Sequence, residues 1–102
     1  MRYRDAVLRT AGEPNNPVMG VLGLAGETGE VVELVKKLTF HGRSFDRQRM
    51  VEELGDVRWY MEYLAACFDI SMAEIEQENV KKLEARYPNG FVKTETDHQV
   101  VS

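Results

Sequence analysis

Apolar residues recur every three or four positions through most of this chain, the spacing typical of helices that pack along one face. Four such segments are separated by short stretches rich in turn-forming residues, at positions 12–17, 41–44, 69–71 and 88–90. No segment shows the strict alternation of apolar and polar residues that marks a half-buried strand. The pattern therefore predicts an all-α fold, a helical bundle of about four helices.

The expected helices span about residues 2–11, 17–42, 45–68 and 71–87. Pro17 suits the first position of a helix, because its missing N–H would have no partner there. Ser71 and Glu74 match a capping box at the start of the last helix. We expect one domain over residues 1–91 and a polar C-terminal tail at 92–102.

Two pairs of acidic residues stand out, because the two negative charges of each pair repel each other within one helix. Glu27 and Glu30 are three residues apart, as are Glu53 and Asp56, so each pair projects from one helix face. Like charges at this spacing destabilise an isolated helix by about 0.2–0.5 kcal/mol per pair. The two pairs lie at nearly equal distances from the turn near Gly42, so antiparallel packing would bring all four carboxylates together.

Converging carboxylates without His or Cys favour a hard divalent cation, Mg²⁺ or Mn²⁺ as a substitute. The plainer alternative is that each pair is part of a solvated helix surface. Two pairs at matched positions within apolar sequence favour the metal site.

Gly20, Gly23, Gly26 and Gly29 recur every third residue beside the first acidic pair. Each glycine costs about 1 kcal/mol relative to alanine inside a helix. Such a run would let another helix or a ligand approach the backbone closely.

Other polar and aromatic residues are candidates for substrate binding. Asn79, Lys82 and Arg86 form a stripe on the last helix that would suit phosphate oxygens, and Lys37 closes the second helix. Ordinary surface charge is the alternative for these residues. Tyr60 lies four residues after Asp56 and could stack on a nucleobase or belong to the core, whereas for its neighbour Trp59 we favour the core or a subunit interface.

The amino-acid composition limits the classes of partner that we expect this protein to bind. With 17 acidic and 13 basic residues the net charge is −4, which argues against broad binding to nucleic-acid polymers. No apolar run approaches the roughly 20 residues that span a bilayer, so we expect no membrane partner and a cytoplasmic location. A chain of 102 residues with one cysteine has a thin stability margin, which self-association would improve.

The acidic pairs and their surroundings resemble the MazG-like members of the all-alpha nucleoside triphosphate pyrophosphohydrolases. The family signature, Glu-x-x-Glu, a spacer and Glu-x-x-Asp, reads here as Glu27–Glu30, 22 residues, and Glu53–Asp56. Sequence similarity to this family extends over most of residues 3–91. One departure is Gly26, where some relatives carry another acid, and this favours a simpler metal site.

The resemblance implies that the four acids bind Mg²⁺, that Lys82 and Arg86 contact the phosphates, and that Asn79 lies near the nucleoside. It also implies a homodimer or a homotetramer formed as a dimer of dimers.

The expected reaction is hydrolysis of a nucleoside triphosphate, ribo or deoxy, to the monophosphate and pyrophosphate, in nucleotide-pool housecleaning. Water would attack the α-phosphorus, with Glu27 or Glu30 as proton acceptor. Two alternatives stay open: a non-catalytic helical interaction module, and a family relative that acts on another nucleotide phosphate ester.

Overall fold

The computed structural model describes residues 1–42 and 44–92, and four helices make up its regular structure. The helices are α1 (Tyr3–Thr10), α2 (Pro17–Phe40), α3 (Arg47–Cys67) and α4 (Met72–Arg86). The described part of the chain holds no strand, so the predicted all-α class is confirmed. The chain divides into two units, Met1–Ser71 and Met72–Ser102, and each is described here by itself. All but the first residue of the predicted tail lies outside the described residues.

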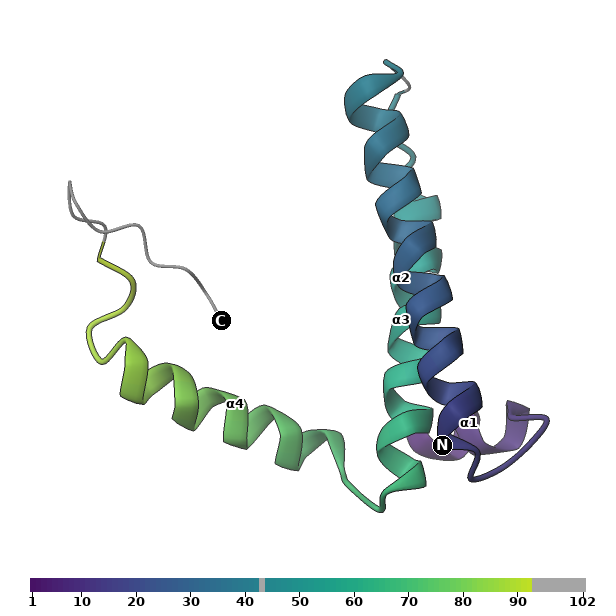
Figure 1. The fold of residues 1–102 in the computed structure, drawn as a ribbon, viewed down its shortest axis with the longest axis vertical. Helices are drawn as coiled ribbons and strands as arrows, with labels where there is room; N and C mark the ends of the chain where they lie inside the picture. Colours follow the sequence, from purple (N-terminus) through teal and green to yellow (C-terminus); the bar gives the residue numbers. More distant parts are fainter. Residues whose placement is uncertain (43, 93–102) are drawn as a thin grey trace. The chain divides into compact units, whose positions relative to one another are not determined.

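Helices α2 and α3 form an antiparallel hairpin in which the two long helices lie side by side (Figure 1). Local side chains begin both helices: Asn16 Oδ1 accepts a hydrogen bond from Met19 N, and Asp46 Oδ1 accepts one from Arg49 N, each at 3.1 Å. These caps satisfy backbone donors that have no partner within the helix. Gly42, with φ of +63°, lies in the turn between the helices, in a backbone conformation that glycine adopts without strain.

Helix α1 packs on α3 through one apolar contact region and one cluster of charges. Val7 is 1% exposed. Arg4 Nε donates to Glu62 Oε2 at 2.6 Å, and Arg4 Nη2 donates to the carbonyl oxygen of Ile70 at 2.6 Å. Arg58 Nη1 lies 2.7 Å from the other oxygen of Glu62, which is itself only 4% exposed. A buried carboxylate between two arginines therefore joins α1 to the end of α3.

The core of this unit is small. Its buried apolar side chains are Val7, Tyr63 and Ala65. The apolar side chains along α3 divide into two groups: Met50, Val57 and Leu64 are half-buried, whereas Leu54 and Met61 are exposed. The difference arises because α2 covers only one side of α3.

The second unit contains α4, which begins directly after Ser71 as the capping pattern predicts. Beyond the helix, Tyr87 and Phe91 make an edge-to-face ring contact at 5.9 Å, and Gly90 turns the chain with φ of +75°. No helix among the described residues combines the length and the apolar character needed to cross a membrane.

Candidate metal centre

Two glycines allow α2 and α3 to approach closely beside the acidic residues. A Cβ atom on Gly23 would lie 2.0 Å from Cε1 of Tyr60, and one on Gly20 would lie 3.2 Å from side-chain atoms of Tyr63 and Leu64. The ring of Tyr60 therefore occupies the space that a side chain at position 23 would need. The predicted close approach is confirmed for these two glycines.

Gly26 and Gly29 differ from the first two. A Cβ atom at either position would meet nothing within 4 Å among the described residues. Gly20 and Gly23 thus serve helix packing. Gly26 and Gly29, which lie before and after Glu27 in the sequence, border open space.

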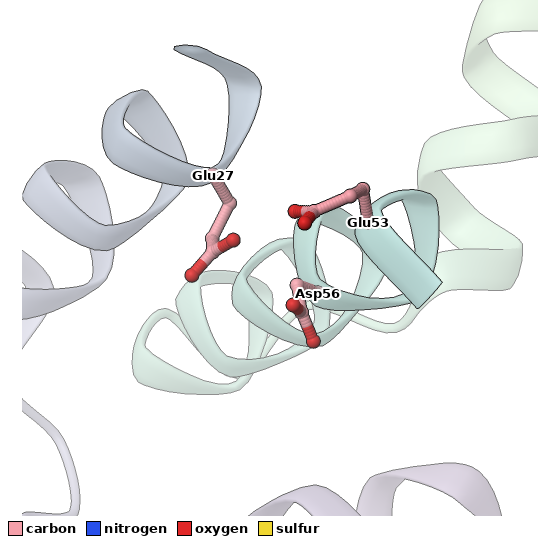
Figure 2. A group of neighbouring side chains, drawn as sticks. All are labelled: Glu27, Glu53 and Asp56. Atoms are coloured by element: carbon pink, nitrogen blue, oxygen red, sulfur yellow. The ribbon is translucent and has the colours of Figure 1, made fainter. Parts of the chain in front are cut away.

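Three of the four predicted carboxylates converge across the hairpin. Glu27 extends from α2 toward Glu53 and Asp56 on α3 (Figure 2), and one oxygen from each can be chosen so that all three lie within 4.8 Å of one another. We call these three residues the carboxylate triad. Glu27 and Glu53 are half-buried and Asp56 is exposed, so the group is reachable from solvent. Such a group could hold a metal ion.

Glu30, the fourth predicted ligand, is exposed on α2 and is not a member of the triad. Its charge still acts on the triad, because it is one of the groups that raise the pKa of Glu27. Its role as a metal ligand stays a prediction.

The pKa of Glu27 lies above its ordinary value of 4.5. Partial removal from water is the largest cause, and the negative charges of Asp56, Glu53 and Glu30 add to it. The ionised triad is therefore short of positive charge. A bound divalent cation would supply that charge and favour the ionised form of Glu27.

Sequence reasoning missed one basic residue at the triad. Arg49 Nε lies 3.1 Å from Glu53 Oε1, in a pair four residues apart on α3. The i,i+4 spacing of an arginine and a glutamate was the available signal. Arg49 partly balances Glu53, whereas Glu27 and Asp56 have no ion pair within residues 1–42 and 44–92.

An open cleft of about 260 Å³ adjoins the triad and is lined by Glu27, Asp56, Trp59 and Tyr60. Its wall combines carboxylates, which suit a cation, with aromatic rings, which suit a planar apolar group. Tyr60 was a predicted binding residue, and it borders this cleft. Trp59 was expected in the core or at a subunit interface, but within this unit it is half-buried and lines the same cleft.

One further predicted binding residue, Lys37, lies away from the triad within the same unit. Lys37 is exposed near the end of α2, ten residues beyond Glu27 and thus about 15 Å farther along the helix axis. Asn79, Lys82 and Arg86 lie on α4, in the second unit, and their approach to the triad stays a prediction.

Residues 18–91 match the model of the MazG nucleotide pyrophosphohydrolase domain. The chain belongs to the MazG family. The match includes both helices of the hairpin from Val18 onward, the carboxylate triad and all of α4.

The chain is also similar to the gene 37 protein of Mycobacterium phage L5, with 33% identity over 54 residues. The matched segment is 53% of this chain and 47% of the phage protein, so the chain matches about half the length of that relative. No solved structure matches this chain.

Proposed function

We propose that this MazG protein is a Mg²⁺-dependent nucleoside triphosphate pyrophosphohydrolase, which converts ribo- or deoxyribonucleoside triphosphates to monophosphates and pyrophosphate. The observation that carries the proposal is the carboxylate triad, which opens onto a cleft with two aromatic residues. Metal-binding groups and ring surfaces in one cleft match the two ends of a nucleotide. The family match supports the reaction class.

Glu27, Glu53 and Asp56 would hold the metal, because oxygen ligands suit Mg²⁺ and their mutual repulsion is relieved by a cation. A bound Mg²⁺ ion would neutralise part of the triphosphate's charge and polarise its phosphorus–oxygen bonds.

The other predicted residues take their roles around this centre. Between the two candidate proton acceptors, Glu30 is favoured, because Glu27 belongs to the triad and Glu30 does not. Lys37, Lys82 and Arg86 would contact phosphate oxygens. Tyr60 would contact the base, and Asn79 the nucleoside.

A second copy of the chain is proposed to complete the site, as a homodimer or as a dimer of dimers. The cleft of about 260 Å³ is smaller than the roughly 300–1,000 Å³ of sites that enclose a small molecule. Large apolar side chains are also exposed along the hairpin, among them Leu22 at 68%, Val32 at 59% and Leu54 at 51%. Surfaces of this kind are typical of protein interfaces.

Nucleotide-pool housecleaning in the cytoplasm is the proposed role.

The direct test is pyrophosphate release from a panel of canonical and modified nucleoside triphosphates, with Mg²⁺, with Mn²⁺ and with a chelator. Asp56→Asn should reduce turnover by about a thousandfold or more, since metal activation is worth several kcal/mol. Glu52→Gln is the matched control, because Glu52 is an exposed neighbour on α3 that accepts a hydrogen bond from Gln48 at 3.3 Å and is not a member of the triad. The control should keep full activity.

Metal-independent release, or full activity in Asp56→Asn, would contradict the proposed metal centre. Release of another product from a nucleotide ester would identify the family relative with a different substrate. If no nucleotide is hydrolysed and none raises the melting temperature with Mg²⁺, the interaction module becomes the better account.

A further inference from the structure

We propose that Trp59 forms the base-stacking wall of the cleft and that Thr10, at the end of α1, is the positioning residue that holds its indole ring. The inference rests on the proposed function, because it assumes that the cleft binds a nucleotide.

Trp59 is placed to meet a molecule that the triad binds. It follows Asp56 by three residues on α3, so the two side chains share one helix face about 4.5 Å apart along the axis. Both line the cleft together with Glu27 and Tyr60. A ligand whose phosphates lie at the carboxylates therefore reaches the indole within the same cavity.

Three contacts determine the orientation of the indole ring. Trp59 Nε1 donates a hydrogen bond to Thr10 Oγ1 at 3.0 Å. Its ring stacks on Tyr63 with centroids 5.5 Å apart and planes 6° from parallel, and it meets Tyr60 edge to face at 4.8 Å. Tyr63 is itself 1% exposed, and its hydroxyl accepts a hydrogen bond from Asn16 N at 2.9 Å. The indole is therefore backed by a buried ring that is itself anchored by a hydrogen bond.

Thr10 is well suited to receive the indole N–H. It is the last residue of α1, and its hydroxyl oxygen lies 2.8 Å from the carbonyl oxygen of Ala6 and 3.0 Å from that of Val7. The hydroxyl proton is donated back into α1, which leaves a lone pair for Trp59. This bond connects α1 to the cleft.

The hydrogen bond limits what Trp59 can recognise. Indole has one polar atom, and that atom is committed to Thr10. Trp59 therefore offers ring surface, which stacks on any base, and no donor that distinguishes one base from another. Among the described residues the Tyr60 hydroxyl has no hydrogen-bond partner, so of the two aromatic residues in the cleft Tyr60 is the one with a polar atom available to a base.

The test uses Thr10→Val, which removes the acceptor but keeps the side-chain shape, and Thr10→Ser, which restores the hydroxyl. Thr39→Val is the matched control, because Thr39 is an exposed threonine near the end of α2. Steady-state kinetics with purine and pyrimidine triphosphates is compared with inhibition by inorganic tripolyphosphate, a probe without a base. Trp59 is the only tryptophan, so its fluorescence reports directly on the wall.

Thr10→Val should raise KM about 2- to 10-fold for all nucleotides, in the range expected for one lost hydrogen bond, with kcat and tripolyphosphate inhibition unchanged. Thr10→Ser should recover most of the affinity. Trp59→Phe, which keeps an aromatic ring on the cleft wall but removes the N–H donor, should raise KM in the same base-independent way. In the wild type, nucleotides with Mg²⁺ should change the Trp59 fluorescence and tripolyphosphate should not.

The inference is overturned if Thr10→Val behaves like Thr39→Val, or if KM and tripolyphosphate inhibition worsen together, since that marks general damage to the site. Failure of the proposed function is a separate result. If no nucleotide is hydrolysed, a fluorescence change with nucleotides but not with tripolyphosphate still supports the stacking wall. Hydrolysis without any such change contradicts the wall and leaves the proposed function standing.

Discussion

The two halves of the α2–α3 hairpin use the same residue types in opposite ways. In the half next to α1, the carboxylate of Glu62 lies between Arg4 and Arg58, at 2.6 and 2.7 Å. In the other half, the triad has one arginine partner among the described residues, Arg49 on Glu53. We call these the closed half and the open half.

The pKa values of the two halves move in opposite directions. Burial alone would raise the pKa of Glu62, but hydrogen bonds from Arg58 and Arg4 and their charges outweigh burial and leave it below its ordinary value. For Glu27, partial burial and the neighbouring negative charges all act to raise the pKa. A carboxylate whose charge is balanced by arginines of the same chain stabilises the fold. A carboxylate with too little positive charge around it is available to bind a ligand.

The glycines show the same division. Gly20 and Gly23 are covered by side chains from α3, while Gly26 and Gly29 border open space. The glycines of the closed half are therefore covered by α3, whereas those beside the triad are not.

The strongest test of this comparison is Glu62→Gln. It leaves Arg4 and Arg58 beside a neutral side chain and should lower the free energy of unfolding by about 3 kcal/mol, the lower end for breaking a buried ion pair. The lower end applies because the arginine side chains remain 27% and 38% exposed. Chemical denaturation measures the change, with Glu52→Gln as the exposed control on the same helix.

A loss in Glu62→Gln no larger than in the control would show that the closed half does not depend on its charge cluster. Turnover per folded molecule should persist in this variant, because Glu62 lies outside the triad.

Alanine substitutions in the glycine run should have opposite signs. Gly23→Ala places a methyl group 2.0 Å from the Tyr60 ring and should destabilise the protein by about 1–3 kcal/mol through overpacking. Gly26→Ala meets open space and should stabilise α2 by up to about 1 kcal/mol. Thermal melts of the two variants, measured side by side, check the prediction. Equal effects would mean that the two halves are packed alike.

The smallest expected effect is in the pH dependence of stability without metal. The folded-state pKa of Glu27 is raised, so its ionisation weakens the fold as pH rises from about its ordinary value of 4.5 through the folded-state value. Glu27→Gln should therefore melt at a slightly higher temperature than the wild type at neutral pH in chelator, and at the same temperature in acid. Glu62 acts with the opposite sign, since its stabilising effect is lost as pH falls through its lowered pKa.

Added Mg²⁺ provides the control for this prediction. It should raise the melting temperature of the wild type and leave Glu27→Gln nearly unchanged. A wild type that is insensitive to Mg²⁺ would contradict the triad as a metal site.

Much of the site followed from one-dimensional spacing. Glu27 lies 15 residues before Gly42, and Glu53 and Asp56 lie 11 and 14 residues after it. Because the rise per residue is the same in both antiparallel helices, the three carboxylates reach a similar level and meet. Spacing could not show that Glu30 stays outside the triad, because one helical turn along α2 separates it from Glu27. Residue spacing also could not show that Arg49 forms an ion pair with Glu53 instead of extending into solvent.

The sequence by itself determined the four helices, their order and the faces that carry the acidic pairs, because these depend on helical period and on local caps such as Asn16 and Asp46. Only the tertiary structure decided which carboxylates gain arginine partners and which glycines are covered. It also decided that Trp59 lines the cleft, bonded to Thr10 from a helix 49 residues earlier in the chain. These outcomes depend on distances between residues far apart in sequence, which the packing of α1 and α2 against α3 determines and no local pattern encodes.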